Sequence, residues 1–240
     1  MIVQACINGA RDSDFHPNLP LTLDAMVLDG MKCVAAGASE LHVHPRDADG
    51  RESLQAVDQL VAAMRRACPG TLIGISTGDW IEGDDAATRQ AIVNWQIPPD
   101  YASVNLSEAD APAIIALLGR MGVGVEAGLA TVDDARRFIS LPESSRVFRV
   151  LIEIDEQQQD EADRLADEIA NVLEEAGIAR PILLHGFDAT VWHFVRRARQ
   201  NRWSTRIGLE DGRLLQGGEM AEGNADLVAE AVKIFRQTER

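Results

Sequence analysis

The sequence predicts a (β/α)₈ TIM barrel that forms a single α/β domain over residues 1–240. Three observations predict this fold. Short apolar segments typical of buried strands alternate eight times with longer segments of helical character. A chain of 240 residues has the length that eight such units need. Polar residues end most strand segments, at the edge where barrels carry their sites. An open, doubly wound sheet is the alternative, because periodicity does not prove that a sheet closes.

The strand and helix segments follow one another without a linker or a second domain. Thr22 is placed to cap the first helix and Gly37 to end it, and Gly177 ends the sixth. The expected strands are 3–8, 40–44, 72–76, 101–105, 123–127, 147–154, 181–185 and 205–210. The expected helices are 23–36, 53–67, 85–96, 111–121, 132–139, 160–176, 191–200 and 225–236.

Alternation along each strand separates an apolar face from a polar one. In the sixth strand, Phe148 and Val150 oppose Arg149 and Glu153. The apolar faces should pack on the helices, so the polar faces should point into the barrel. The polar residues expected at the upper strand ends are Asn8, His44, Ser76, Asn105, Glu126, Glu153, His185 and Glu210. So many polar groups around one rim indicate a polar, metal-bearing cavity.

A histidine pair in the second strand is the most specific signal of chemistry. His42 and His44 are two residues apart, so their side chains share one face of the strand. Two neutral imidazoles side by side can chelate a divalent metal such as zinc, provided that a third ligand exists elsewhere. The alternative is a buried pair satisfied by hydrogen bonds alone. Glu210 could likewise be a helix-capping acid, and Arg206 could form a buried ion pair with Glu40 instead of acting in catalysis.

The composition excludes several classes of protein. The net charge is −15 and the pI about 4.7, which argues against nucleic acid or an anionic membrane as the main partner. We find no apolar run of the roughly 20 residues that a membrane span needs, and the first residues are predicted to enter a strand rather than a signal peptide. Cys6, Cys33 and Cys68 show no paired spacing and are expected to be buried thiols in a reducing cytoplasm.

These residues together resemble the β-keto acid cleavage enzymes, a family whose namesake is the 3-keto-5-aminohexanoate cleavage enzyme. The resemblance rests on motifs that span nearly the whole chain in the same order. They are Ala36-Gly37-Ala38, His42-Val43-His44-Pro45-Arg46-Asp47 with Gly50, Ser76-Thr77-Gly78, Arg206-Ile207-Gly208-Leu209-Glu210-Asp211 and Asn224-Ala225-Asp226-Leu227-Val228. The histidine motif and the Arg206 motif are specific in combination.

The resemblance implies a zinc site made by His42, His44 and Glu210. It implies a reaction in which a β-keto acid and acetyl-CoA give acetoacetate and the CoA ester of the shortened acid. Zinc would bind the keto oxygen and the carboxylate and stabilise the enolate. The resemblance implies a base, either Asp211 or Glu126, and an Arg206 that orients Asp211 or stabilises an oxyanion. It also implies substrate contacts from Ser76 and Asn105, with Asn8 as a further candidate. Relatives of this kind assemble into homo-oligomers.

The chain departs from the family's pattern at several points. The family carries a glutamate after the Gly-Ala pair in the first loop, whereas Arg11 and Asp12 follow Gly9-Ala10 here. Asp12 or Asp14 would take over its contact with the substrate, or the substrate differs. Glu153 stands where relatives tend to be apolar, the segment after Asn105 is shorter, and a tail seen in relatives is missing.

Two other functions stay open from the sequence. One is another zinc-dependent barrel reaction on a small carbonyl compound, such as hydrolysis of an amide or ester. That class would place its paired histidines on the first strand, whereas the pair here falls on the second. The other is a non-catalytic protein that binds a metal or a metabolite, since fold resemblance does not guarantee activity.

Overall fold

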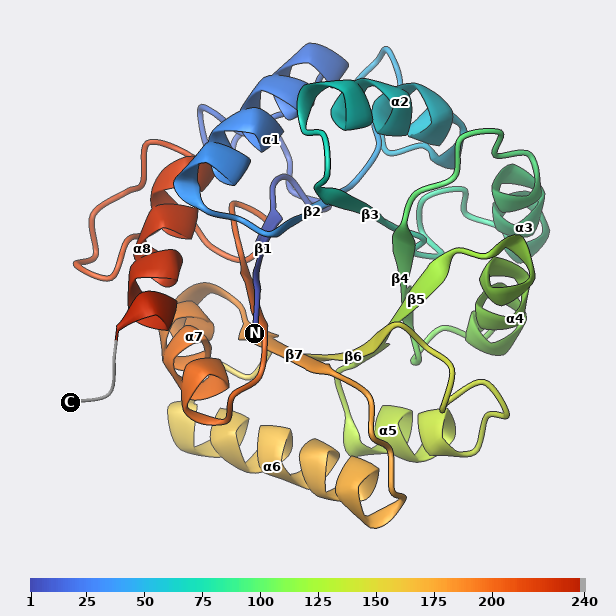
Figure 1. Cartoon of the computed structure of the whole chain (residues 1–240), viewed down its shortest axis with the longest axis vertical. Helices are drawn as coiled ribbons and strands as arrows, with labels where there is room; N and C mark the ends of the chain where they lie inside the picture. The colour runs from blue at the N-terminus through green and yellow to red at the C-terminus, as the bar shows by residue number, and fades with distance from the viewer. Residues whose placement is uncertain (238–240) are drawn as a thin grey trace.

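Eight parallel strands form a ring in the computed structural model, which describes residues 1–237 (Figure 1). The strands pair in the order β7-β6-β5-β4-β3-β2-β1-β8. A parallel bridge between Leu183 and Ser204 joins the two ends of this order, and the backbone nitrogen of Leu184 donates to the carbonyl of Ser204 at 2.9 Å. The barrel predicted from the sequence is therefore confirmed, and the open sheet is excluded.

Each strand is followed by a helix on the outside of the ring. The strands are β1 (Val3–Cys6), β2 (Glu40–Val43), β3 (Leu72–Ser76), β4 (Tyr101–Asn105), β5 (Gly124–Leu129), β6 (Arg149–Ile154), β7 (Ile182–Gly186) and β8 (Thr205–Ile207). The helices are α1 (Leu23–Ala36), α2 (Val57–Ala67), α3 (Asp85–Val93), α4 (Ala111–Met121), α5 (Val132–Ile139), α6 (Gln159–Glu175), α7 (Val191–Gln200) and α8 (Asn224–Arg236). Short 3₁₀ turns, η1 (Leu54–Ala56) and η2 (Asp188–Thr190), precede α2 and α7.

Local sequence signals explain most of these boundaries. The Thr22 hydroxyl accepts from the backbone nitrogen of Ala25 at 3.3 Å and caps α1, as the sequence predicts. The expected helix 53–67 is instead a 3₁₀ turn followed by α2, and the expected helix 85–96 ends at Val93. The last strand was expected to reach Glu210 but ends at Ile207, so Glu210 lies in the loop after β8.

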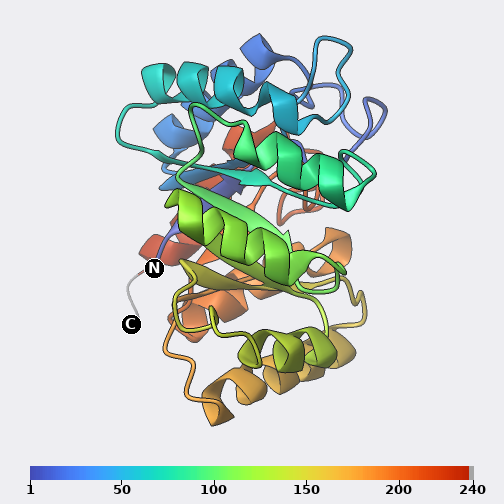
Figure 2. The same ribbon diagram turned by 90° about the vertical axis from the view of Figure 1, so that its right-hand side faces the viewer.

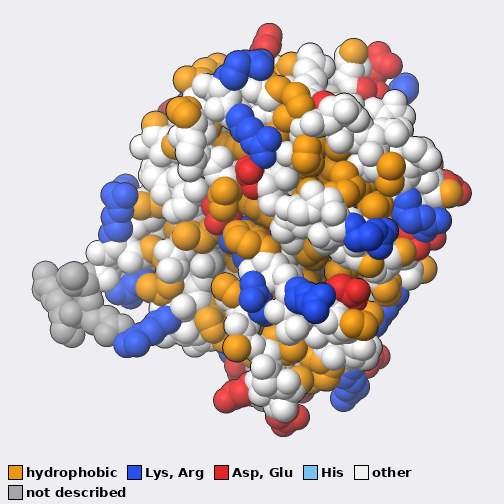
Figure 3. Space-filling model, turned by 45° about the vertical axis from the view of Figure 1, so that its right-hand side comes forward, with side chains coloured by type: hydrophobic (Ala, Val, Ile, Leu, Met, Phe, Trp, Pro, Cys, Tyr) orange, Lys and Arg blue, Asp and Glu red, His pale blue; other side chains and the backbone are white. Residues whose placement is uncertain are grey.

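The helices cover the ring on all sides and bury its outer apolar face. Figure 2 shows helices above and below the strands, and Figure 1 places α8 beside α1, two helices from opposite ends of the chain. Leu41 of β2 points outward against α1, where it lies beside Gly30. On the face drawn in Figure 3, charged side chains of both signs lie among apolar ones. No described helix is long and apolar enough to cross a membrane.

A buried ion-pair cluster fills the barrel on the side of its N-terminal strand ends. The guanidinium of Arg149 bonds to both Glu40 and Glu126 and lies 4.9 Å from the centre of the Tyr101 ring. Gln4 Nε2 donates to the Tyr101 hydroxyl at 2.8 Å. Burial raises the pKa of Glu126, but Arg149 outweighs burial and lowers it, so Glu126 is ionised at neutral pH.

Removing the cation from this cluster should destabilise the fold. Arg149→Ala would leave two carboxylates buried without their partner, which costs about 3–5 kcal/mol of unfolding free energy. Urea unfolding followed by circular dichroism measures this loss. Arg136→Ala is the control, because Arg136 and its partner Asp133 are 67% and 88% exposed and such pairs contribute at most about 1 kcal/mol. Equal losses in the two variants would contradict the role of Arg149.

Candidate metal centre

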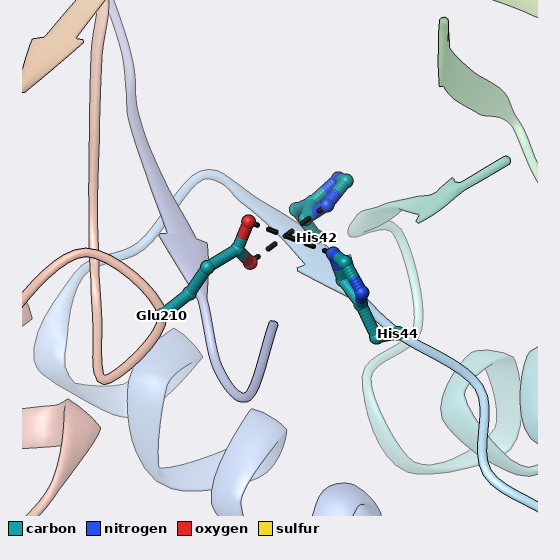
Figure 4. Close-up of side chains that lie close together, drawn as sticks. All are labelled: His42, His44 and Glu210. Atoms are coloured by element: carbon teal, nitrogen blue, oxygen red, sulfur yellow. Dashed lines mark ion pairs between the residues drawn. The ribbon is translucent and has the colours of Figure 1, made fainter. Parts of the chain in front are cut away.

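Three side chains converge at the C-terminal mouth of the barrel. His42 lies in β2, His44 directly follows it, and Glu210 lies in the loop after β8 (Figure 4). His42 Nε2 is 3.8 Å from Glu210 Oε2, and His44 Nε2 is 3.5 Å from Glu210 Oε1. One donor atom from each residue lies within 4.8 Å of the other two. The three residues expected to bind a metal are therefore brought together.

The geometry of these donors fits a divalent cation. Two ligand atoms about 2.0–2.1 Å from a tetrahedral zinc ion lie about 3.4 Å apart, close to the separations of Glu210 from the two imidazoles. Those separations are too long for strong hydrogen bonds. Glu210 Oε2 is buried and has no hydrogen-bond partner among the described residues, so it retains a lone pair for a cation. Two imidazoles and a carboxylate form a ligand set typical of zinc sites that keep an open position.

The backbone around Glu210 is shaped by two close contacts. A Cβ on Gly208 would lie 1.9 Å from the carbonyl oxygen of Cys6 in β1, so only glycine fits at this crossing. Gly9 has a φ of +55°, and a Cβ there would lie 2.4 Å from Cγ of Glu210. The loops after β1 and β8 can therefore approach closely enough to direct Glu210 toward β2.

Asn8 holds the backbone of one ligand. Its side-chain oxygen accepts from the His44 backbone nitrogen at 2.9 Å, and its Nδ2 donates to the His44 carbonyl at 2.9 Å. Asn8 is fully buried and does not line the cavity. The sequence predicted a substrate contact for Asn8, whereas in the structure its amide orients the backbone of a metal-ligand candidate.

Glu52 and Trp80 hold the His44 ring from the side. Glu52 Oε1 lies 2.5 Å from His44 Nδ1, and Trp80 Nε1 donates to Glu52 Oε2 at 3.0 Å. The Trp80 ring also stacks on the His44 ring, with centroids 6.4 Å apart and planes at 24°. A carboxylate on Nδ1 holds a proton there and directs Nε2 toward Glu210, which is the usual arrangement behind a metal-bound histidine.

The two histidines have opposite protonation in the metal-free protein. Burial lowers the pKa of His42 to about 4, so this ring is neutral. Burial also lowers the pKa of His44, but Glu210 and Glu52 outweigh burial and raise it to about 9. For Glu210, burial raises the pKa, whereas Arg206 and the two rings outweigh burial and hold the pKa well below its usual range. A metal ion would thus have to displace one proton, from His44.

Arg206 links the metal centre to a second carboxylate. Its NH2 group donates to Glu210 Oε1 at 2.7 Å and to Asp211 Oδ1 at 2.9 Å. The Cys6 thiol donates to Asp211 Oδ2 at 2.7 Å, and His185 Nδ1 is 3.3 Å from Asp211 Oδ1. Burial raises the pKa of Asp211, but Arg206 and His185 outweigh burial and lower it, so Asp211 is ionised.

The ion pair between Arg206 and Glu40 that the sequence left open does not form. Glu40 bonds to Arg149 at the other end of the barrel, and Arg206 bonds to the two acids of its own loop. Both arginines point into the barrel, as strand alternation predicts. Their partners differ because Arg206, unlike Arg149, lies within reach of the two acids in the loop after β8.

The candidate centre opens into a cavity of about 750 Å³. Two of the expected substrate contacts, Ser76 and Asn105, line it. The other lining residues are Ala10, Arg11, His42, His44, Trp80, Ser103, Leu151, Glu153, Asp155, Gln157, Phe187, Asp188, Arg206 and Glu210. A cavity of this size accommodates a small organic acid and part of a larger co-substrate.

Three other residues predicted for the site do not line this cavity. Asp12 is exposed in the loop after β1. Asp211 is fully buried behind Arg206, and Glu126 is fully buried in the cluster around Arg149.

The sequence also missed residues of the site. Glu52 pairs with Arg46 in an isolated antiparallel β-bridge across a short hairpin. Because this segment belongs to no regular strand or helix, its periodicity does not identify Glu52. An aromatic residue after Ser76-Thr77-Gly78, at the face of the barrel that carries sites, is a signal that could have identified Trp80.

Comparisons with known proteins show which family the chain resembles along its length. The family model of the beta-keto acid cleavage enzymes matches residues 1–116 and 135–240. Two proteins named 3-keto-5-aminohexanoate cleavage enzyme, from Acetoanaerobium sticklandii and Fusobacterium nucleatum subsp. nucleatum, are each 32% identical over 108 residues, or 44% of this chain. The match spans 38% and 39% of those relatives, so the chain covers roughly two fifths of their length.

Solved structures share the fold at low sequence identity. A complex of ObcA with oxaloacetate has a TM-score of 0.74 and 18% identity, over 90% of this chain and 63% of that chain. A 3-dehydroquinate dehydratase from Geobacillus kaustophilus has a TM-score of 0.60 and 11% identity, over 98% of this chain and 92% of that chain. At these identities the likeness shows the barrel and does not transfer a reaction.

Fold and site together define a (β/α)₈-barrel protein with a candidate His-His-Glu metal centre at its C-terminal mouth. The chain belongs to the β-keto acid cleavage enzyme family, because the family model matches most of its length.

Removing the support of His44 should weaken metal binding without abolishing it. Glu52→Ala deletes the carboxylate on Nδ1, and losses of this kind cost about 10–100-fold in affinity. His44→Ala removes a ligand and should strip the metal. Isothermal titration with zinc measures both variants, and Asp49→Ala is the control, because Asp49 lies in the same hairpin with its side chain 75% exposed. If His44→Ala still holds one zinc per chain, the ligand assignment is wrong.

Metal binding should release one proton at neutral pH. The pKa of His44 is raised to about 9, so its ring is protonated below that pH, whereas the metal needs it neutral. Apparent affinity should therefore rise about tenfold per pH unit up to about pH 9 and then level off. The pKa of His42, about 4, adds no proton in this range. Calorimetry in buffers of different ionisation enthalpy counts the protons, and a count of zero at pH 7 would exclude a charged His44.

Proposed function

We propose that the protein is a zinc-dependent β-keto acid cleavage enzyme that uses acetyl-CoA. The β-keto acid R–CO–CH₂–COO⁻ and acetyl-CoA would give acetoacetate and R–CO–SCoA, so the acyl group R–CO exchanges its CH₂–COO⁻ partner for CoA. The observation that supports this most is the convergence of His42, His44 and Glu210 beside a cavity in a chain that the family model matches.

His42, His44 and Glu210 would hold the metal. Zinc in this position would supply a Lewis acid that stabilises negative charge developing on the substrate. Other side chains hold the ligand His44 in place before a metal binds. Asn8 holds its backbone, and Glu52 holds its ring. Arg206 keeps Glu210 ionised and so preserves its affinity for a cation.

Of the two candidate bases, Asp211 lies nearer the metal centre, with Arg206 between its carboxylate and the cavity. It shares the Arg206 guanidinium with Glu210 and therefore lies directly behind the metal centre. Three neighbours hold its carboxylate, and its lowered pKa keeps it ionised at neutral pH. Glu126, the other candidate, is occupied by Arg149 in the buried cluster.

The remaining contacts in the proposal come from the cavity wall. Ser76 and Asn105 line it and would donate hydrogen bonds to the substrate or to the thioester. Asp12 would have to approach from its exposed loop, where Arg11 already lines the cavity. Assembly into a homo-oligomer is part of the same proposal, by analogy with the family.

A substrate screen tests the reaction. Zinc-loaded protein is incubated with acetyl-CoA and a panel of β-keto acids, and both acetoacetate and the new acyl-CoA are quantified. Equimolar formation of the two products is expected. Product formation without acetyl-CoA would favour a zinc-dependent hydrolase, and binding of the acids without turnover would favour a non-catalytic protein; either result contradicts the proposal.

Changing the base should separate catalysis from metal binding. Asp211→Asn removes the carboxylate but keeps the shape, so turnover should fall by about 10²–10⁴-fold, as for loss of a general base. Metal content should stay at one zinc per chain, because Asp211 is not among the convergent donors. Steady-state kinetics with elemental analysis checks both, and near-normal turnover would remove Asp211 from the mechanism.

A further inference from the structure

A buried amide joins the loop after β8 to the segment after β1. Asn224, the first residue of α8, is fully buried. Its Oδ1 accepts from the backbone nitrogen of Leu209 at 2.6 Å, and its Nδ2 donates to the carbonyl of Ile7 at 2.8 Å. Leu209 directly precedes the candidate ligand Glu210, so this side chain bonds to the backbone that carries the third donor.

The partners of this amide allow it one orientation. Nδ2 also donates to Oδ2 of Asp29 in α1 at 2.7 Å. The carbonyl of Ile7 can only accept and the backbone nitrogen of Leu209 can only donate, so the oxygen must face the β8 side and the nitrogen the β1 side. Asn224 therefore connects the two terminal helices to both strands through defined hydrogen bonds.

The amide also replaces one step of the ladder between β8 and β1. At the start of β8, the backbone nitrogen of Thr205 donates to the carbonyl of Ile2 at 3.1 Å. The same register, four residues further along both strands, would pair the nitrogen of Leu209 with the carbonyl of Cys6. Instead the nitrogen of Glu210 donates to that carbonyl at 3.4 Å, and the nitrogen of Leu209 bonds to the amide. A slip of one residue exchanges the two faces of a strand, so this offset bears directly on the direction of Glu210.

A second amide holds the neighbouring ligand from the same segment. Asn8 directly follows Ile7, and its side chain bonds to both the backbone nitrogen and the carbonyl of His44. The amides of Asn224 and Asn8 therefore form a continuous series of hydrogen bonds from the loop after β8, across the end of β1, to the end of β2. His44 Nε2 and Glu210 Oε1, 3.5 Å apart, lie at the two ends of this series.

We propose that Asn224 is a positioning residue for the metal centre and that, together with Asn8, it sets the distance between the Glu210 carboxylate and the His44 imidazole. The inference rests on the ligand assignment in the proposed function and is independent of the reaction. It gives a buried amide outside the cavity a role in metal affinity.

The structure also indicates what loss of the amide would do. The nitrogen of Leu209 and the carbonyl of Ile7 would both be buried without a partner, which is costly for backbone groups. The nitrogen of Leu209 could recover a partner by taking the carbonyl of Cys6 in the register of β8. That pairing would displace Glu210 from the same carbonyl and turn its side chain away from the histidines.

Asn224→Ala tests this role through metal binding. Isothermal titration should show zinc affinity lowered by about 10–100-fold, the range for residues that support a metal ligand. The visible absorption bands of the cobalt(II)-loaded protein should also shift, because they report the geometry of the donors. Leu173→Ala is the control for stability: it removes a buried side chain from α6, which packs on β6, a strand that carries none of the three donors. This control should destabilise the fold but keep the zinc affinity and the cobalt bands.

An exchange of side chains between α8 and α1 provides a second test. Asn224→Asp keeps an oxygen for the nitrogen of Leu209 but places a carboxylate against that of Asp29, so zinc affinity should fall. Adding Asp29→Asn restores a donor and an acceptor to this contact, so the double variant should recover part of the affinity.

The outcomes separate this inference from the proposed reaction. Wild-type zinc affinity and cobalt bands in Asn224→Ala overturn the inference, and so does an equal loss of affinity in Leu173→Ala. If Asn224→Ala does not fold, the exchange decides: recovery in the double variant supports the inference, and no recovery overturns it. Zinc binding without turnover of any β-keto acid leaves the inference standing while the proposed reaction fails. If wild-type protein binds no zinc, the ligand assignment fails and the inference fails with it.

Discussion

The candidate site depends on closure of the barrel between β8 and β1. Glu210 and the two histidines are far apart in the sequence, and they meet because β8 pairs with β1 and β1 pairs with β2. The crossing is tight, since Gly208 lies against the Cys6 carbonyl with no space for a side chain. Any residue larger than glycine there would move the loop that carries Glu210. Packing of backbone against backbone therefore positions the third donor.

The interior of the barrel has two layers with different electrostatics. In the layer nearer the N-terminal strand ends, the Arg149 guanidinium compensates the charges of Glu40 and Glu126. At the C-terminal mouth, Glu210 Oε2 is buried and has no hydrogen-bond partner among the described residues. Paired charges in the first layer stabilise the fold, whereas the unpartnered carboxylate oxygen at the mouth is suited to binding a cation near the histidines.

The residues that support the site are of two kinds: some hold a single candidate ligand, and one, Arg206, contacts two carboxylates. Asn8 and Glu52 both act on His44, one through its backbone and the other through its ring. Arg206 acts on Glu210 and Asp211 together, so the metal centre and the candidate base share one cation. A change at this guanidinium would reach both functions at once. The guanidinium thus couples the ionisation of the candidate metal ligand Glu210 to that of the candidate base Asp211.

The sequence by itself determined the order of strands and helices, the shared face of His42 and His44, and the inward direction of Glu153, because these follow from local periodicity. It also pointed to Glu210, both through alternation in the expected strand 205–210 and through a motif, although β8 ends at Ile207 and Glu210 lies in the loop after it. Only the tertiary structure decided that Arg149 rather than Arg206 pairs with Glu40, and that Glu52 and Trp80 hold His44. These partners come from separate loops and strands, and side-chain contacts across a closed barrel depend on register and loop path, which no local pattern encodes.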